Sequence, residues 1–269
     1  MGDRLLLVGC GKMGGAMLSG WLERGAEAGD ITVIEPHPDA AEAARRAHGV
    51  RVLEAPERVA DDPPAVVVFA VKPQTLPDMA SAYAPVAAAG AVTLSIAAGR
   101  PIGFFEAALG GDAAIVRSMP NTPAAVGRGI TAACANARVG ADQRALCQRL
   151  LSAIGEVVWV EDEGLIDAVT AVSGSGPAYV FLLIECMTEA GIAEGLPPDI
   201  AARLARATVA GSGELARLSD EDAAQLRINV TSPGGTTEAA LGVLMADDGM
   251  AALMKRAIAA AARRSRELA

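Results

Sequence analysis

Short runs of β-branched and aliphatic residues alternate with alanine-rich stretches of helical periodicity across the first 160 residues of the chain. This alternation is typical of βαβ units, in which helices cover both faces of a parallel sheet. We expect strands at residues 5–8, 31–35, 66–71, 91–96 and 114–117, with a shorter pair at 130–133 and 156–160 extending one edge of the sheet. The pattern therefore predicts an α/β fold for this part of the chain.

The pattern changes after the acidic run at residues 161–163. The residues that follow contain no convincing strand and are typical of helices separated by glycine, proline and capping residues. We therefore expect a first domain at residues 1–162 and a second, all-helical domain at residues 163–269. Because the chain has only two Trp, two Tyr and four Phe, the helical domain is expected to need a partner subunit to bury its faces.

One uncharged segment, residues 79–99, is long enough to span a bilayer. Polar and helix-breaking residues interrupt it, and most of the remainder is alanine, which inserts weakly. We interpret it as a surface helix followed by a buried strand and expect no membrane association. Since the first residues lack the apolar run of a signal peptide, the expected location is cytoplasmic.

Composition and charge narrow the classes of function. The chain is 52% apolar and 20% charged, which is typical of a globular protein and excludes disorder. A formal net charge of −9 argues against a nucleic-acid partner, because phosphates are bound by clustered Lys and Arg. The four cysteines show no zinc-type spacing, and His37 and His48 lie in no metal-type or triad-type motif. No bound metal is expected.

A glycine-rich turn follows the first expected strand and precedes a helical stretch. Glycines at this place allow a tight turn and let backbone amides approach a pyrophosphate, while the helix N-terminus supplies partial positive charge. Glu35 closes the next expected strand 21 residues after Gly14, near the spacing of an acid that accepts hydrogen bonds from an adenosine ribose. The expected dinucleotide-binding residues are Gly9, Cys10, Gly11, Lys12, Met13, Gly14 and Glu35. The alternative interpretation is a glycine-rich turn without a ligand.

The expected cofactor is NADPH or NADH. A carboxylate at Glu35 repels the 2′-phosphate of NADPH, so this residue favours NADH. His37, two residues later, is interpreted either as a partial offset to that repulsion or as a solvated loop residue.

Further candidate residues follow the carboxyl ends of later strands, where an open parallel sheet forms its binding crevice. Proline fixes the loops at two of these places, so Lys72 and Asn121 are expected to face the cofactor. The expected cofactor-binding residues of these loops are Val71, Lys72, Pro73, Ala98 and Asn121. Ordinary βα turns without a ligand remain an equal alternative.

The helical half contains a candidate anion site at residues 230–239. Ser232 is predicted as an N-cap and Pro233 as the first helical residue, so the next three backbone amides would be unpaired. With the neighbouring hydroxyls these amides would hold a carboxylate the size of an amino acid's. The expected cradle consists of Ser232, Gly234, Gly235, Thr236 and Thr237. The alternative is a cap that serves stability alone.

Taken together, six segments closely resemble the pyrroline-5-carboxylate reductases, and the resemblance covers essentially the whole chain. They are GCGKMG at 9–14, FAVKP at 69–73, SIAAG at 95–99, MPNTP at 119–123, AVSGSGPAY at 171–179 and VTSPGGTT at 230–237. The resemblance implies an N-terminal Rossmann-like dinucleotide-binding domain followed by an all-α dimerisation domain. It also implies a homodimer assembled into a larger ring such as a decamer.

The resemblance implies roles for individual residues as well. Residues matching 232–237 hold the substrate carboxylate, and Lys72, Ala98 and Asn229 lie along the cofactor. Glu163 approaches the ring nitrogen of the substrate, and Thr237 is the best-placed proton donor. Hydride passes from C4 of the dihydronicotinamide to the C=N carbon, which needs position and charge more than a catalytic histidine. Where this chain has Glu35, many relatives carry a hydroxyl or basic residue, so the NADP preference of the family is in doubt here.

Two other readings of the sequence remain. The β-hydroxyacid dehydrogenases also join a dinucleotide-binding half to a helical half, but they rely on a lysine in the helical domain, and residues 164–254 contain none. A non-catalytic dinucleotide sensor or membrane-associated scaffold is less favoured, because a sensor has no need of a carboxylate cradle.

Overall fold

The structure, a computed structural model, describes residues 3–55 and 63–268. Its contacts divide the chain into two compact units. Unit 1 comprises Met1–Gly174 and Ala262–Ala269, and unit 2 comprises Ser175–Ala261.

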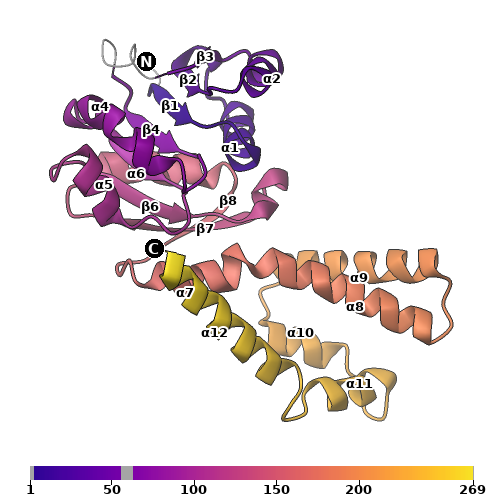
Figure 1. Ribbon diagram of the computed structural model, residues 1–269. Helices are drawn as coiled ribbons and strands as arrows, with labels where there is room; N and C mark the ends of the chain where they lie inside the picture. Colours follow the sequence, from indigo (N-terminus) through magenta and orange to yellow (C-terminus); the bar gives the residue numbers. More distant parts are fainter. Residues whose placement is uncertain (1–2, 56–62, 269) are drawn as a thin grey trace. The chain divides into compact units, whose positions relative to one another are not determined.

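Unit 1 is built on an eight-stranded sheet of order β3-β2-β1-β4-β5-β6-β7-β8 (Figure 1). Neighbouring strands are parallel except β6 and β7, which are antiparallel. The strands are β1 (Leu5–Val8), β2 (Ile31–Ile34), β3 (Arg51–Leu53), β4 (Val66–Phe69), β5 (Val92–Ser95), β6 (Ile115–Met119), β7 (Gly129–Ala135) and β8 (Gly155–Trp159). All seven expected strands are confirmed, and the expected α/β class with them. Strand β3 was not predicted, because it has only three residues and Val52 alone among them is buried.

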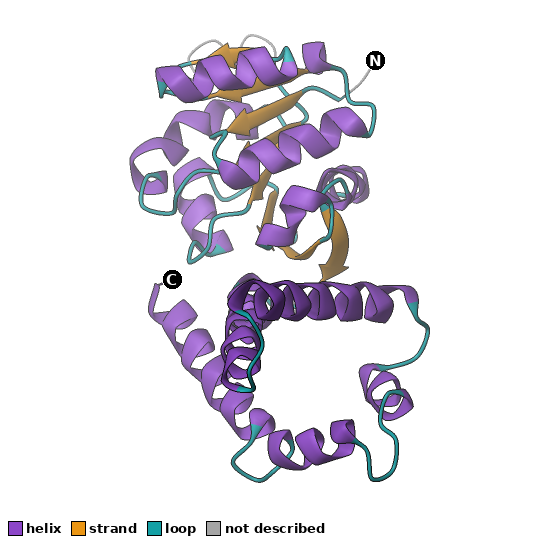
Figure 2. Ribbon diagram, turned by 90° about the vertical axis from the view of Figure 1, so that its right-hand side faces the viewer, coloured by secondary structure: helices purple, strands orange, loops and turns teal. Residues whose placement is uncertain are grey.

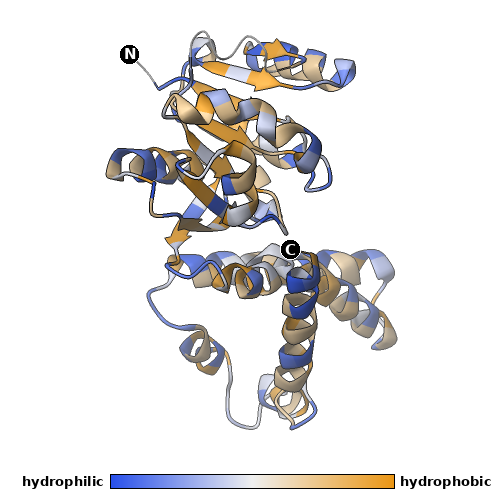
Figure 3. Cartoon of the chain, turned by 60° about the vertical axis from the view of Figure 1, so that its left-hand side comes forward, coloured by the Kyte–Doolittle hydropathy of each residue, from blue (hydrophilic) through white to orange (hydrophobic). Residues whose placement is uncertain are grey.

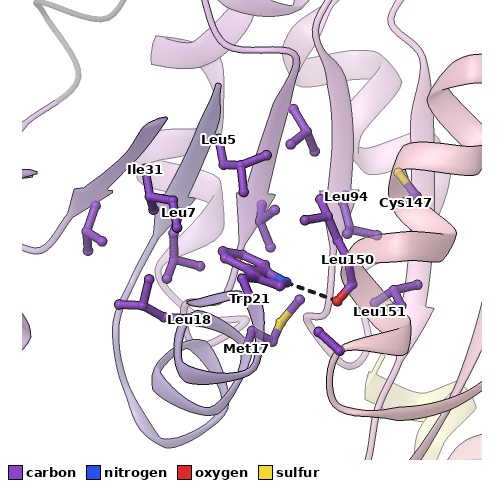
Figure 4. Close-up of a cluster of buried hydrophobic side chains, with 14 of the residues drawn as sticks. Leu5, Leu7, Met17, Leu18, Trp21, Ile31, Leu94, Cys147, Leu150 and Leu151 are labelled. Carbon is purple, nitrogen blue, oxygen red and sulfur yellow. Dashed lines mark hydrogen bonds between the residues drawn. The ribbon is translucent and has the colours of Figure 1, made fainter. Parts of the chain in front are cut away.

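Helices cover both faces of this sheet, because successive strand residues point to opposite sides. Leu5 and Leu7 face a first apolar cluster, into which α1 (Lys12–Glu23) inserts Trp21, while Leu6 and Val8 face a second apolar cluster on the other side of the sheet. The Trp21 indole N–H donates to the Leu150 carbonyl at 3.0 Å and so joins α1 to α6 (Ala141–Ser152) (Figure 4). The helical segments are α1 (Lys12–Glu23), η1 (Ala28–Asp30), α2 (Pro38–His48), α3 (Leu76–Met79), η3 (Ala80–Tyr83), α4 (Ala84–Ala88), α5 (Ile102–Leu109), η4 (Thr122–Val126), α6 (Ala141–Ser152), α7 (Leu165–Val169) and η5 (Thr170–Gly174).

The uncharged segment 79–99 has the structure expected of it. It contributes short helical turns at the surface of unit 1 and then β5, whose four residues are all buried. The segment therefore contributes one buried strand to the sheet of unit 1 and short helical turns that pack on it.

Unit 2 is helical throughout (Figure 2). Its helices are α8 (Gly176–Ala193), α9 (Pro198–Leu218), α10 (Ala223–Asn229), α11 (Thr236–Leu244) and α12 (Met250–Leu268), whose last residues belong to unit 1. Helices α8 and α9 pack against each other, with Gly191 of α8 closely approaching Ala201 of α9. Most of the large apolar side chains of this unit are exposed, including Phe181 and Leu182 of α8. Figure 3 shows that apolar and polar residues are interspersed along the helices of the chain.

One helical run among the described residues, Leu165–Ala193, is long and apolar enough to cross a membrane by length and composition alone. Its mean hydropathy is 1.3, and 6% of its most apolar window is buried. The sequence did not single out this run, because its two halves lie on either side of the Ser-Gly-Ser-Gly segment.

The division between units does not coincide with the change of sequence pattern at residue 163. Helix α7 packs against β6 and β7, and its Ile166 is buried in the second apolar cluster of unit 1. The Ser173 carbonyl, in η5, accepts a hydrogen bond from the Asn121 amide. At the far end of the chain, the Ser265 hydroxyl donates to the Asp167 carboxylate at 2.6 Å. Residues 163–174 and the last turn of α12 are therefore anchored on the sheet unit.

Candidate functional site

The glycine-rich turn joins β1 to α1, and its three glycines have different surroundings. Gly9 has a φ of 90°, and a Cβ there would lie 2.7 Å from the Val71 side chain. A Cβ on Gly14 would lie 2.3 Å from the Gly9 carbonyl oxygen. Around Gly11 nothing lies within 4 Å of such an atom. The outer glycines therefore allow the turn to pack closely, while Gly11 leaves its backbone open to a ligand.

The start of α1 also suits an anion. Its N-cap, Gly11, has no side chain to cap the helix. Among the described residues, none accepts a hydrogen bond from the backbone amides of Lys12, Met13 or Gly14. Unpaired amides at a helix N-terminus, with the partial positive charge of the helix, are a common binding site for phosphate. The turn and helix start therefore fit the pyrophosphate of a dinucleotide.

Glu35 lies directly after β2 and contacts this turn. It is 6% exposed, and each of its carboxylate oxygens accepts a backbone hydrogen bond. Oε2 accepts from the Cys10 amide at 3.0 Å, and Oε1 accepts from the His37 amide at 3.1 Å. Burial, with the Glu35 carboxylate beside it, raises the pKa of the Cys10 thiol, so this cysteine stays protonated.

The loops after β4 and β5 lie beside one another. The Val71 side chain packs against Gly9 of the glycine turn, and the Pro73 carbonyl accepts a hydrogen bond from the Arg100 guanidinium at 3.0 Å. Lys72 and Ala98 are exposed on these loops. Unit 1 therefore brings Lys72 and Ala98 onto two adjoining loops at the carboxyl end of the sheet, the edge at which α1 begins.

Asn121 has a different environment from the one expected. It is buried, its Oδ1 accepts from the Ile130 amide at 3.0 Å, and its Nδ2 donates to the Ser173 carbonyl at 3.1 Å. The side chain thus links the loop after β6 to β7 and η5. Its clearest role in this structure is to hold three segments together, and direct contact with the cofactor remains a prediction.

Glu163 is held at the same end of the sheet by two donors. Its Oε1 accepts from the Ile102 amide at 2.8 Å and from the Arg117 guanidinium at 2.7 Å. The Arg117 side chain is 7% exposed and that of Glu163 30%. Among the described residues, no partner is found for Oε2 of Glu163. One oxygen is therefore fixed inside unit 1, and the other is left for a further contact.

Arg117 was missed as a candidate by the sequence reasoning. The signal was present, since Arg117 interrupts the apolar run of β6, where its neighbours Ile115 and Val116 are buried. A buried arginine requires a charged or strongly polar partner. The sequence did not identify that partner as Glu163, 46 residues later along the chain.

The candidate cradle of unit 2 has a different start from the one predicted. The Gly235 amide donates to the Ser232 carbonyl at 3.0 Å, so residues 232–235 form a turn, and Gly234 within it has a φ of 70°. Helix α11 begins at Thr236 with Gly235 as its N-cap. The prediction of Ser232 as N-cap and Pro233 as first helical residue is therefore wrong. Proline followed by glycine favours a turn with positive φ at the glycine, and this delays the helix.

Because the helix begins later, different backbone amides are available to bind a carboxylate. Gly235 is used in the turn, and the Gly234 amide donates to the Glu238 carboxylate at 2.7 Å. The amides of Thr236 and Thr237, in the first turn of α11, have no partner among the described residues. A carboxylate-binding site is therefore expected one or two residues later along the chain than the sequence predicted, still next to threonine hydroxyls.

Asn229 ends α10 in unit 2 and bonds within its own unit. Its Oδ1 accepts from Gln225 and its Nδ2 donates to Glu221, each at 2.8 Å. Its expected position along the cofactor remains a prediction. Among the described residues, no group of three or more His, Cys, Asp or Glu is arranged to hold a metal ion.

Two family models match the chain. The model described as "Pyrroline-5-carboxylate reductase dimerisation" matches residues 163–268, and the model "NADP oxidoreductase coenzyme F420-dependent" matches residues 4–99. The pyrroline-5-carboxylate reductase of Pseudomonas aeruginosa is 42% identical over 267 residues, covering 99% of this chain and 97% of its own length. That of Synechocystis is 41% identical and covers 100% and 99%.

Solved structures agree with these matches. A pyrroline-5-carboxylate reductase from Coxiella burnetii superposes with a TM-score of 0.94 at 34% identity, covering 99% of this chain and 98% of that one. A Plasmodium falciparum pyrroline carboxylate reductase with NADP bound has a TM-score of 0.83 at 28% identity, with the same coverage. The chain belongs to the pyrroline-5-carboxylate reductase family of NAD(P)H-dependent oxidoreductases.

Proposed function

We propose that this chain reduces 1-pyrroline-5-carboxylate to L-proline with NAD(P)H, in the last step of proline biosynthesis. The observation that carries the proposal is the identity of 42% and 41%, over nearly the whole chain, with two proteins named for this activity. Both units also contain residues suited to one of the two reactants, a dinucleotide turn in unit 1 and an amide-rich helix start in unit 2.

Unit 1 supports the cofactor half of the proposal. A bound nicotinamide cofactor supplies the hydride. The turn from Gly9 to Gly14, with the amides of α1 that have no partner among the described residues, would hold its pyrophosphate, because Gly11 leaves that side of the backbone open. Lys72 and Ala98, exposed at the carboxyl end of the sheet, are the residues that would line the path of the cofactor.

Unit 2 supports the substrate half. The substrate carries one carboxylate. The start of α11 offers the amides of Thr236 and Thr237, which have no partner in the described part of the chain, together with their hydroxyls and that of Ser232. Gly234 and Gly235 keep this surface free of bulky side chains. These groups bind a carboxylate by hydrogen bonds and the helix dipole without a basic side chain.

The chemical step adds a hydride to the C=N carbon and a proton to the ring nitrogen, which yields the secondary amine of proline. Thr237 is the proposed catalytic residue, since its hydroxyl belongs to the carboxylate site and can donate or relay that proton. Glu163, whose Oε1 is held by two donors and whose Oε2 has no partner among the described residues, is proposed to accept a hydrogen bond from the substrate. Aligning two bound reactants lowers a barrier by about 7–11 kcal/mol, so positioning supplies most of the catalysis.

The chain forms a homo-oligomer, as the match of residues 163–268 to a dimerisation family indicates. The exposed apolar side chains of α8 and α9 support this assembly, because they leave unit 2 without a closed core. We extend the proposal to a dimer assembled into a larger ring such as a decamer, located in the cytoplasm. The same apolar faces are then covered by protein and not by lipid.

The test compares the rates of turnover with different substrates and with the two cofactors. The purified chain is mixed with 1-pyrroline-5-carboxylate and either NADH or NADPH, and the loss of absorbance of the reduced nicotinamide is followed. Turnover with at least one cofactor, and proline as the product, is expected. Turnover of a β-hydroxyacid with NAD or NADP, and none of the imine, would support the rival dehydrogenase. Cofactor binding with no turnover of either substrate would support a sensor.

Substitution of Thr237 tests the assignment of the substrate site. We expect Thr237→Ala to raise KM for the imine and to lower kcat, each by about tenfold, the loss of one or two charge-assisted hydrogen bonds. Cofactor affinity, measured separately by calorimetry, is expected to stay within twofold of the parent. Unchanged kinetics in this variant would remove Thr237 from the site.

A further inference from the structure

The last turn of α12 lies against the loop that follows β5, residues 96–100. Gly99 of this loop is buried and has a φ of 68°. A Cβ on Gly99 would lie 2.8 Å from the Leu268 carbonyl oxygen and 3.5 Å from the Leu268 side chain, so a larger residue would push the helix end away. The neighbouring Ala98 is exposed. The end of the helix therefore covers Gly99 and leaves Ala98 accessible.

The same turn is held a second time, by a buried hydrogen bond. The Ser265 hydroxyl donates to the Asp167 carboxylate of α7 at 2.6 Å, and Ser265 is 7% exposed. Along α12, all of which the structure describes, Ser265 alone is buried, whereas large apolar side chains such as Leu253 are exposed. A buried hydroxyl needs a partner, and a bond to a carboxylate is stronger than one between neutral groups. The turn is therefore fixed to unit 1 by a specific polar contact.

The first of these contacts lies next to residues proposed for the cofactor site. Gly99 directly follows Ala98, which is proposed to lie along the cofactor. The next residue, Arg100, donates from its guanidinium to the Pro73 carbonyl at 3.0 Å, and Pro73 follows Lys72. A displacement of this loop therefore moves Ala98 and disturbs the loop that carries Lys72.

The second contact has a proposed site residue beside it as well. Asp167 lies four residues after Glu163. The Ile102 amide, which donates to Glu163 at 2.8 Å, comes three residues after Gly99. The end of α12 therefore contacts two segments that are also joined to each other through Glu163.

We propose that the last turn of α12 is a positioning element of the dinucleotide site and that Ser265 is its positioning residue. The bond to Asp167 keeps the helix end in place, and the helix end keeps the loop of residues 96–100 in the conformation that receives the cofactor. Support of this kind matters here, because a glycine with positive φ gives the loop wide conformational freedom. A loop that is in place for only part of the time lowers the cofactor affinity by that fraction.

The test measures cofactor affinity by isothermal titration calorimetry, with NADH and NADPH titrated separately into the full chain. Ser265→Ala removes the hydroxyl. The dissociation constant of the tighter-binding cofactor is expected to rise about fivefold, within the free energy of one hydrogen bond to a carboxylate. Ser265→Thr keeps a hydroxyl and is expected to bind the cofactor more tightly than Ser265→Ala does. The value of kcat at saturating cofactor is expected to change by less than about twofold, because bound cofactor selects the loop conformation that receives it.

Arg264→Ala is the matched control. Arg264 precedes Ser265 in the same turn, and its exposed side chain pairs with Glu267 of the same helix at 3.0 Å. Since an exposed ion pair contributes little, the cofactor affinity of this variant is expected to stay within about twofold of the parent. A thermal melt of each variant separates a loss of stability from a loss of affinity.

Two results would overturn the proposal. One is a Ser265→Ala chain that binds the cofactor as tightly as the parent, even if it melts at a lower temperature, because the turn would then serve stability alone. The other is a loss of affinity in Arg264→Ala equal to that in Ser265→Ala, because the effect would then not depend on the buried bond.

The proposal rests on the proposed function only in taking the carboxyl end of the sheet as the dinucleotide site, and the calorimetry contains no imine. A parent chain that does not reduce the imine, with the expected loss of affinity in Ser265→Ala, would refute the proposed activity and leave the positioning role standing. An active parent chain whose cofactor affinity does not respond to Ser265→Ala would do the reverse.

Discussion

The two units bury their apolar residues in different ways. In unit 1 the sheet has one apolar cluster on each face, and the residues of β1, β4 and β5 are all buried. In unit 2 the long helix α8 contains no buried residue, although it is one of the most apolar segments of the chain. The sheet unit therefore has its own apolar core within one chain, whereas the apolar side chains of α8 are left for contact with a second copy, as the match to a dimerisation family indicates. Dinucleotide binding is expected to follow the first unit, and substrate binding to follow assembly.

The largest expected effect comes from a substitution on the exposed face of α8, which tests whether unit 2 needs a second copy. Phe181 is 58% exposed in the single chain. In Phe181→Asp we expect loss of the dimer and a fall in imine reduction of more than about a hundredfold, because a buried unpaired carboxylate in an interface costs several kcal/mol. NADH affinity is expected to change by less than about threefold, since unit 1 has its own core. Size-exclusion chromatography with light scattering and calorimetry measure the two effects.

Val126→Asp supplies the control for that prediction. Among the described residues of unit 1, Val126 is the most exposed large apolar side chain, at 74%, so the same substitution there is expected to leave the dimer intact. A Phe181→Asp protein that remains dimeric, or that loses NADH binding as fully as it loses turnover, would contradict the division of roles between the units.

The second effect concerns the core of unit 1. Trp21 packs between α1 and the sheet and donates to the Leu150 carbonyl. Trp21→Ala is expected to lower the free energy of unfolding of unit 1 by about 3–5 kcal/mol, as large-to-small changes in a closed core do. Urea unfolding followed by circular dichroism measures it, and the loss is expected to be independent of protein concentration.

The other tryptophan, Trp159, provides a matched comparison. It is only half-buried, bonds to Gln148 and lies under the Arg144 guanidinium. Trp159→Ala is therefore expected to cost less than Trp21→Ala. Equal losses would show that burial in the first cluster does not set the stability of this unit.

The third effect lies at the buried ion pair of unit 1. Arg117 and the Ile102 amide both bind Oε1 of Glu163, so Arg117 acts as a positioning residue for that carboxylate. Arg117→Met is expected to lower kcat by about tenfold and stability by about 1.5–3 kcal/mol, the cost of losing a hydrogen bond to a charged group. KM for the nicotinamide cofactor is expected to stay unchanged. Arg117→Lys is expected to restore part of kcat, and a stability loss with no change in kcat would assign Arg117 a structural role alone.

Much of the fold could be predicted from the sequence, because local patterns of apolar and polar residues indicate where its strands and helices lie. Buried β-branched runs marked seven strands, whereas β3 was missed because its three residues bury only Val52 fully. The start of α11 was predicted three residues too early, because Ser-Pro fits a helix N-terminus as well as it fits a turn. The pairing of Arg117 with Glu163 and the bracing role of Asn121 join distant parts of the chain. No local pattern encodes such contacts, so they required the tertiary structure.

The smallest expected effect concerns Glu238, in the first turn of α11. Its carboxylate already accepts a hydrogen bond from the Gly234 amide at 2.7 Å, one of the amides expected to receive the substrate carboxylate. A substrate carboxylate arriving at this helix start therefore meets a like charge. Glu238→Gln is expected to lower KM for the imine by about threefold, since a helix-end charge contributes about 0.3–1 kcal/mol.

Asp222→Asn is the matched control for Glu238→Gln, because Asp222 caps α10 by accepting a hydrogen bond from the Gln225 amide at 2.8 Å. This control is expected to lose a little stability with no change in KM. A rise in KM for Glu238→Gln would show that the carboxylate helps to hold the substrate loop in shape.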